Sequence, residues 1–191
     1  MRTLLRSLSL VALALVASCK SSGDPVATEL LDTPVYTRVG MRFDASRGRF
    51  LMHSTNYIGM AHHLQPGSKL TLKKASRKGF ELVDDEGSTY VINYNLKHSL
   101  MPMAEWREQH FAEIPEKLTD VYTDDELDAI QSGQVREGMT RAAVFLAIGY
   151  PPKSNNPSMN AKVLKYEVRR PFISRSIRFD GDDKVEQVGR R

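Results

Sequence analysis

The first half of the chain alternates polar and apolar residues with the period of β-strands. Over residues 34–98 many apolar positions are β-branched or aromatic, with polar residues between them, a pattern typical of half-buried strands. Residues 78–83 and 89–94 show it clearly, and the Asp-Asp-Glu-Gly loop at 84–87 can join them as a hairpin. We therefore predict a small antiparallel β-rich sheet or partial barrel of four to six strands over residues 34–98.

The second half of the chain begins with residues that are typical of helix starts and helix ends. Thr123 and Glu126 have the spacing of a capping box, in which each side chain bonds the backbone N–H of the other. Thr140 can cap a second helix, and the apolar run 142–148 predicts that this helix is buried on more than one side. Gly149 can then close the helix in the left-handed conformation. Three residues are expected to matter for stability: Gly138, Thr140 and Gly149.

Three further strands follow a Pro- and Asn-rich loop at residues 150–161. Residues alternate along 164–168 and again along 173–179, so that one face of each strand is apolar. The Asp-Gly-Asp-Asp turn at 180–183 leads to a last strand at 185–188. The order helix, helix, strand, strand, strand predicts two helices packed on one face of a sheet. The fold class is therefore α+β, a β-rich unit followed by an ααβββ two-layer domain.

These signals divide the chain into five segments. Residues 1–18 form a signal peptide, residues 19–33 a polar tether, and residues 34–98 the β-rich domain. Residues 99–118 are expected to form a short helix and a linker, because prolines stand near both ends of this segment. Residues 119–191 form the domain of two helices and three strands.

The N-terminus has the pattern of an export signal. Arg2 and Arg6 precede an apolar run at 8–17, which is too short to span a bilayer. Cys19 follows as the only cysteine, so no disulfide can form within the chain. The Val-Ala-Ser-Cys sequence at 16–19 resembles a bacterial lipobox. The alternative is an ordinary signal peptide with an incidental cysteine.

The resemblance to a lipobox implies that the membrane is a partner. It implies that Cys19 is acylated after cleavage, and several acyl chains anchor a protein stably. Lys20 stands where Gram-negative lipoproteins retained in the inner membrane commonly carry an aspartate. We therefore predict a lipid-anchored protein of the outer membrane that faces the periplasm of a Gram-negative bacterium.

Charge and reactive residues narrow the function. Without residues 1–18 the chain has 25 Lys and Arg against 23 acids, because that segment holds two of the 27 bases and no acid. This balance argues against nucleic-acid binding. His62 and His63 are adjacent and would point to opposite faces of a strand, and no zinc or nucleophile motif accompanies them. We predict no enzymatic activity, metal, cofactor or small-molecule substrate.

Basic residues of the last strands give a candidate binding surface. It consists of Lys165, Arg169 and Arg178, which alternate with apolar residues and are expected on the outer faces of their strands. Such residues either form a solvated sheet face or meet anionic lipid headgroups or an acidic patch of a partner.

The C-terminal domain carries sequence features of a known family. The matching positions are 130–133, Val135, 138–140, Val144, Gly149, Pro151, Leu164, Tyr166, Ile177, 179–181 and Val185. With this order of elements, residues 119–191 resemble the BamE family, also called SmpA/OmlA, which are small outer-membrane lipoproteins of the β-barrel assembly machinery. Two features depart from the family: Leu164 stands where many members have tryptophan, and a β-rich segment precedes the domain.

This resemblance implies a function without catalysis. The chain is expected to act as a binding or scaffold module in envelope maintenance, with outer-membrane β-barrel protein assembly as its specific role. Partners would be assembly proteins of the outer membrane or anionic lipid such as phosphatidylglycerol. The topology is also similar to that of β-lactamase-inhibitor proteins, so the alternative is a periplasmic inhibitor or sensor that binds a protein. An envelope enzyme of an unrecognised type is the third hypothesis.

Overall fold

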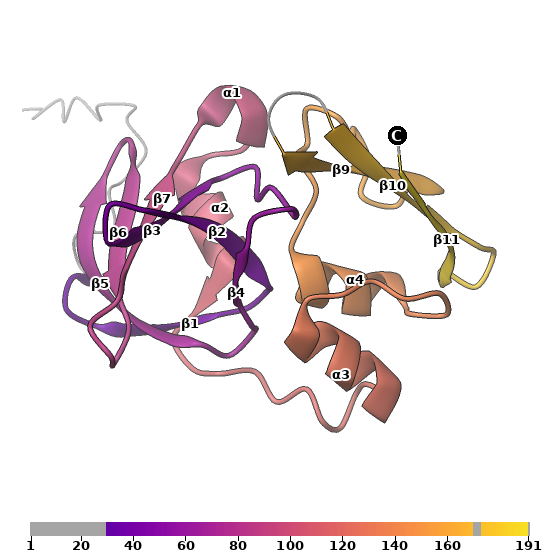
Figure 1. The fold of residues 1–191 in the computed structure, drawn as a ribbon, viewed down its shortest axis with the longest axis horizontal. Coiled ribbons are helices and arrows are strands. Elements are labelled where there is room, and N and C mark those ends of the chain that lie inside the picture. Colours follow the sequence, from indigo (N-terminus) through magenta and orange to yellow (C-terminus); the bar gives the residue numbers. More distant parts are fainter. Residues whose placement is uncertain (1–29, 170–172, 191) are drawn as a thin grey trace, which may run out of the picture.

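The protein consists of two units that lie beside each other. The computed structural model describes residues 30–169 and 173–190, with the backbone alone at Arg169 and Arg190. Figure 1 shows a strand-rich N-terminal unit and a smaller C-terminal unit, in which two helices pack on a three-stranded sheet. The predicted α+β class is confirmed, and the protein is rich in strands.

The N-terminal unit is built on one curled sheet of eight strands, in the order β4-β2-β3-β7-β6-β5-β1-β8. In chain order the strands are β1 Pro34–Thr37, β2 Met41–Ser46, β3 Arg49–His53, β4 His62–Leu64, β5 Lys69–Ser76, β6 Gly79–Val83, β7 Thr89–Asn93 and β8 Phe111–Ala112. Alternate residues face the core, as in β5, where Leu70 and Leu72 are buried and the residues on either side of each are not. Burial of this apolar face stabilises the sheet.

Two features of this sheet differ from the prediction. It has eight strands instead of four to six, because β4 and β8 have three and two residues and are too short to show an alternating pattern. The strands β3 and β7 pair in parallel, so the sheet is not purely antiparallel. A parallel pair needs a long crossover, and residues 54–88, which include β4, β5 and β6, supply it.

A helix lies within the curl of the sheet (Figure 1). This helix is α2 (Met103–His110), and a separate turn, α1 (Leu96–Ser99), precedes it. Trp106 is 2% exposed, stacks on His110 with 3.9 Å between ring centroids, and donates from Nε1 to Ser54 O at 3.1 Å. Burial lowers the pKa of His110 to about 4, so this imidazole is a neutral part of the core at physiological pH.

The C-terminal unit has the predicted order of elements. These are α3 Asp124–Ser132, α4 Arg141–Ile148, β9 Val163–Arg169, β10 Ile173–Phe179 and β11 Val185–Arg190. The strands are antiparallel, in the order β11-β10-β9. Residues of both helices and all three strands share one core, which includes Val144, Leu164 and Phe179.

The two predicted helix caps are formed, and they share one carboxylate. Thr123 N donates to Glu126 Oε2, and Glu126 N donates to Thr123 Oγ1, both at 3.3 Å. Glu126 Oε1 also accepts from Thr140 N at 2.9 Å and from Thr140 Oγ1 at 2.8 Å. Burial pushes the pKa of Glu126 upward, but the hydrogen bonds from Thr140 and Thr123 outweigh it and leave the pKa lowered. One ionised carboxylate therefore joins the first turns of α3 and α4.

The N-terminal unit caps the C-terminus of α4. Gly40 N donates to Leu146 O at 2.6 Å, and Asn56 Nδ2 donates to Ile148 O at 2.7 Å. Asn56 is 1% exposed and also bonds within its own unit, where Nδ2 donates to Gly40 O at 3.2 Å and Oδ1 accepts from Arg42 N at 3.0 Å. The last carbonyls of a helix have no partner inside it, so these bonds satisfy groups that the junction of the two units buries.

The residue that follows α4, Gly149, also has a conformation and a close contact that this junction requires. Gly149 has φ 76° and ψ −175°, so the left-handed closure predicted for it is wrong. This extended conformation with positive φ is essentially restricted to glycine. A Cβ at this position would lie 2.3 Å from Asn56 Nδ2, so the missing side chain is what lets the two units approach here.

We predict that Asn56→Ala lowers the free energy of unfolding by about 2–4 kcal/mol, because it removes three hydrogen bonds and leaves the buried Ile148 carbonyl without a partner. Urea unfolding followed by Trp106 fluorescence and by far-UV circular dichroism measures the loss. Asn160→Ala removes the same side chain from an exposed loop position and should change stability by less than about 0.5 kcal/mol. Equal stability of the two variants would contradict this account of the junction.

We also predict that two glycine substitutions differ although both glycines have positive φ. Gly138→Ala meets open space at φ 84° and should cost about 1 kcal/mol of backbone strain. Gly149→Ala adds a clash with the Asn56 amide, so its cost should be at least about 3 kcal/mol. Thermal and urea unfolding of both variants give the comparison. Losses of the same size would show that the close approach at Gly149 adds nothing to backbone strain.

Candidate functional site

The structure brings two of the three predicted basic residues onto one exposed face. Lys165 on β9 is opposite Ser176 on β10, and Arg178 on β10 is opposite Val163 on β9. Since both are exposed while their apolar neighbours are buried, their side chains share the outer face of the sheet. The backbone of Arg169 pairs within the same sheet, but its side chain lies outside what the structure describes.

This outer face carries charges of both signs. Glu167 follows Lys165 on the same side of β9 and accepts from Asn155 Nδ2 at 3.1 Å. Glu186 is exposed on β11, the strand on the other side of β10. The surface is therefore less uniformly basic than its three bases suggested. Cys19, the predicted lipidation site, lies outside the described residues. Across residues 30–169 and 173–190, no helix is long and apolar enough to cross a membrane.

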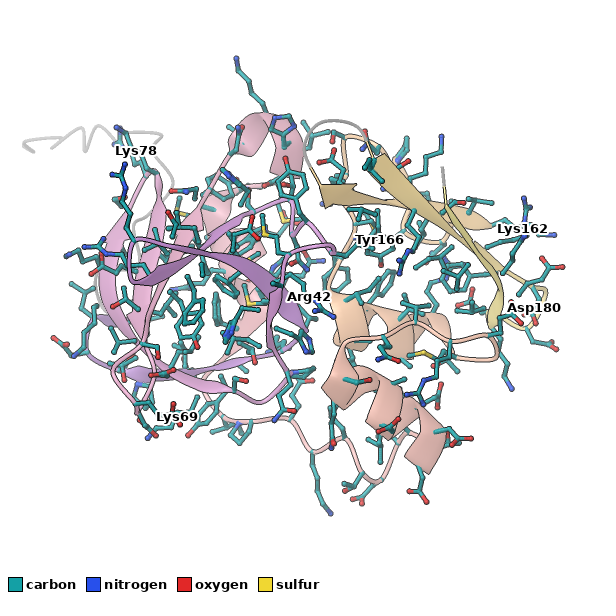
Figure 2. The ribbon with its side chains drawn as sticks, in the orientation of Figure 1. Arg42, Lys69, Lys78, Lys162, Tyr166 and Asp180 are labelled. Carbon is teal, nitrogen blue, oxygen red and sulfur yellow. The ribbon has the colours of Figure 1, made fainter. Side chains whose placement is uncertain are left out.

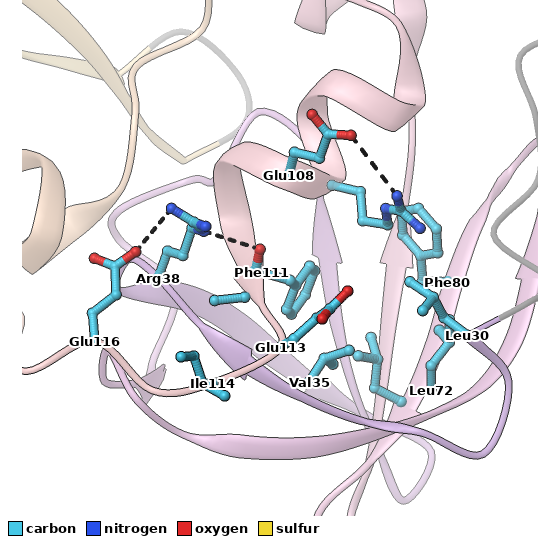
Figure 3. Close-up of a pocket in the computed structure, with 13 residues that line it drawn as sticks. Leu30, Val35, Arg38, Leu72, Phe80, Glu108, Phe111, Glu113, Ile114 and Glu116 are labelled. Carbon is cyan, nitrogen blue, oxygen red and sulfur yellow. Dashed lines mark hydrogen bonds and ion pairs between the residues drawn. The ribbon is translucent and has the colours of Figure 1, made fainter.

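An apolar pocket opens in the N-terminal unit. Its cavity has a volume of about 500 Å³. Figure 3 shows the residues that line it, which lie on strands of the curled sheet and on the segments beside them, with charged residues at the rim. Five apolar wall residues come from β1, β5, β6 and β8: Val35, Leu72, Phe80, Leu82 and Phe111. Ligand sites in proteins are typically cavities of this size with apolar walls and a few polar groups, so we take this pocket as the candidate binding site.

Two ion pairs lie at the rim of the pocket. Arg38 Nη1 lies 2.8 Å from Glu116 Oε1, and Arg38 Nε donates to Phe111 O at 3.1 Å. Arg107 Nη2 lies 3.9 Å from Glu108 Oε1. Such partly exposed pairs contribute little to stability. The contacts of Arg38 instead fix the position of the chain after β8, which runs along one side of the opening (Figure 3).

Sequence reasoning missed this pocket because connecting segments form much of it. Leu30 belongs to the predicted tether, yet it packs on the core of the sheet and lines the cavity. Ile114 belongs to the predicted linker, lines the same cavity and is 75% exposed. The sequence carried no specific signal for these contacts, because single apolar residues in connecting segments are common and uninformative.

The two adjacent histidines make separate contacts. His62 stacks on Phe50 with 3.9 Å between ring centroids, and its Nε2 is 3.2 Å from Tyr90 Oη. His63 faces the other unit, where a Cβ on Gly133 would lie 2.6 Å from its Cε1. Burial lowers the pKa of both imidazoles, and that of His63 falls to about 4. Within the described ranges, no three His, Cys, Asp or Glu residues are placed to hold a metal ion.

Comparison with protein-family models, with curated proteins and with solved structures finds no match to this chain. The pocket, the exposed sheet face and the junction of the two units are therefore the features of the molecule that bear on its function.

We predict that reversing the basic residues of the outer face weakens binding to anionic vesicles. The variant is Lys165→Glu, Arg169→Glu and Arg178→Glu, in the chain without residues 1–19. Each base near an anionic surface contributes about 1 kcal/mol, so the partition coefficient on phosphatidylglycerol vesicles should fall on the order of 100-fold. Sedimentation with vesicles measures it.

The matched control reverses three exposed bases of the N-terminal unit: Arg77, Lys78 and Lys97. It changes the net charge equally and should bind vesicles much more strongly than the sheet-face variant. Unchanged sedimentation of the sheet-face variant would remove lipid as the partner of this surface.

Proposed function

We propose that this chain is a non-enzymatic, lipid-anchored binding module of the outer membrane, which holds an apolar segment of an envelope protein in the pocket of its N-terminal unit. The observation that carries the proposal is the open apolar cavity of about 500 Å³ between the curled sheet and the segment after β8. A role in envelope maintenance, and in outer-membrane β-barrel assembly in particular, follows from the resemblance of residues 119–191 to the BamE family.

The chemistry of the pocket suits a peptide segment with large apolar side chains. Ile114, which is 75% exposed, offers apolar contact at the mouth of the pocket, and Phe80 and Phe111, each at most 8% exposed, form part of the apolar wall behind it. Apolar contact of this kind supplies most of the free energy in anchor pockets of protein interfaces. Glu113 lines the rim and forms no ion pair with the described residues, whereas Arg38 is already paired with Glu116. The rim therefore favours a partner that has a basic residue beside its apolar anchor.

The position of the pocket along the chain suits a membrane-anchored protein. Leu30 lines the pocket and follows Cys19 by eleven residues. An extended chain of that length reaches at most about 40 Å. With Cys19 acylated as proposed, the pocket stays close to the membrane surface, where envelope proteins present apolar segments before they fold.

The second unit supports the same proposal. Its elements α3, α4, β9, β10 and β11 follow each other in the order that the resemblance to BamE implies. Lys165 and Arg178 lie exposed on the outer face of its sheet, away from both helices. In the proposed module this face contacts an assembly protein or anionic lipid, while the N-terminal unit binds the apolar segment.

We predict that Ile114→Asp reduces capture of the partner by at least about fivefold, because it places a carboxylate at the mouth of an apolar site. Ile114 is 75% exposed, so the variant should fold normally. The measurement is affinity capture by the lipidated protein from solubilised outer membranes, quantified by mass spectrometry.

Val121→Asp is the matched control, because Val121 is 71% exposed and lies outside the pocket. Capture of barrel-assembly subunits that depends on Ile114 and not on Val121 supports the proposed module. Capture of a soluble periplasmic protein in its place would favour an inhibitor or sensor. Equal capture by both variants would rule out the pocket as the binding site.

A further inference from the structure

A second cavity, of about 320 Å³, lies where the two units meet. The N-terminal unit contributes Arg42 and Ile58 to its lining. The C-terminal unit contributes Gly133, Gln134 and Arg175, among others. Figure 2 shows Arg42 between the two units. Two guanidinium groups thus line one cavity, and none of the described residues in its lining is acidic.

Arg42 reaches the cavity from β2. Its Nη2 donates to Gly133 O at 2.7 Å, at the C-terminus of α3. Its Nε is buried and has no hydrogen-bond partner among the described residues. Burial, and after it the positive charge of Arg175, lowers the pKa of the Arg42 guanidinium. The two cations are therefore close enough to repel each other.

Arg175 reaches the cavity from β10, where it is opposite Tyr166 of β9. This places it on the inner face of the sheet, which otherwise buries apolar and aromatic side chains. Its Nε is also buried without a hydrogen-bond partner, and the guanidinium forms no ion pair with the described part of the chain. Arg175 therefore brings into the junction a positive charge that none of the described residues neutralises.

The hydrogen bond from Arg42 to Gly133 O caps α3 and explains why this guanidinium lies in the cavity, since a cation at a helix C-terminus is stabilising. It does not account for Arg175 or for the two buried Nε donors. Donors of this kind nearly always have a partner, and close like charges are costly unless a counter-charge lies between them. We propose that Arg42 and Arg175 together bind a compact oxyanion, with the chemistry of a phosphate group, in the cavity between the two units.

A phosphate group matches this pair of side chains chemically. The guanidinium fork donates parallel hydrogen bonds to two oxygens, and arginine is the cation best suited to partly buried sites of this kind. The exposed side chain of Gln134 lines the same cavity and can donate a further hydrogen bond from its amide. The site shares no residue with the apolar pocket, so its test is independent of the proposed function.

The test titrates the full-length protein in detergent with inorganic phosphate, at constant ionic strength, by isothermal calorimetry. Saturable binding is expected, with a dissociation constant in the millimolar range or below. Arg175→Gln should weaken it by at least about tenfold, because it removes one of two charge-assisted donor groups. Its Trp106 fluorescence should stay unchanged, since Arg175 forms no ion pair with the residues that the structure describes. Arg77→Gln makes the same change at an exposed site and should bind phosphate normally.

Two lysine variants keep the test usable if the glutamine variant does not fold. Arg42→Lys and Arg175→Lys retain the charge without the fork and should bind with intermediate affinity. Sedimentation with phosphatidylglycerol vesicles separates the sources of the phosphate group. If Arg175→Gln weakens both phosphate and vesicle binding, the natural ligand is a lipid headgroup; if it weakens phosphate binding alone, the ligand is a free phosphate compound. Absence of phosphate binding, or equal binding by Arg175→Gln and Arg77→Gln, would overturn the proposal.

Discussion

The relative placement of the two units depends on the C-terminus of α4. A helix leaves its last carbonyls without partners, and the carbonyls of Leu146 and Ile148 meet the N-terminal unit. Gly40 N and the Asn56 amide supply their hydrogen bonds. A buried carbonyl without such a partner costs about 1–3 kcal/mol, and hydrogen bonds require a narrow range of distances and angles. The junction therefore allows one orientation of the units, which hydrophobic contact alone would not specify.

The segment between β3 and β4 extends this junction to the second sheet. Ile58 N donates to Glu167 O at 3.0 Å, and Gly59 N donates to Val168 O at 2.8 Å, on the edge strand β9. An uncovered edge strand would present such groups to other chains. The N-terminal unit thus covers part of this edge, and the same contact brings β2 toward β10. The approach of Arg42 to Arg175 is a direct result of how the two units satisfy each other's backbone groups.

Local sequence signals predicted local structure well, because caps, hairpins and amphipathic faces depend on residues a few positions apart. Lys165 could be placed on an outer sheet face for this reason. The link from Glu126 to Thr140, the parallel pairing of β3 with β7 and the apolar pocket all depend on residues that are distant in the sequence. The cavity that joins Arg42 and Arg175 shows the limit most clearly. Neither arginine belongs to a motif, and only the packing of two units makes them neighbours.

A fixed orientation of the two units lowers the entropic cost of binding a partner that contacts both of them. Because the junction fixes their orientation, a partner that contacts both the pocket and the outer sheet face does so without the entropic cost of ordering the two units. Leu30 enters the fold eleven residues after Cys19, so a lipid anchor would confine the pocket to about 40 Å from its attachment point. Confinement raises the effective concentration of membrane-associated partners and leaves that of freely diffusing proteins unchanged. With such an anchor, chain length and rigidity would favour an envelope partner over a soluble one, independently of the residues that line the pocket.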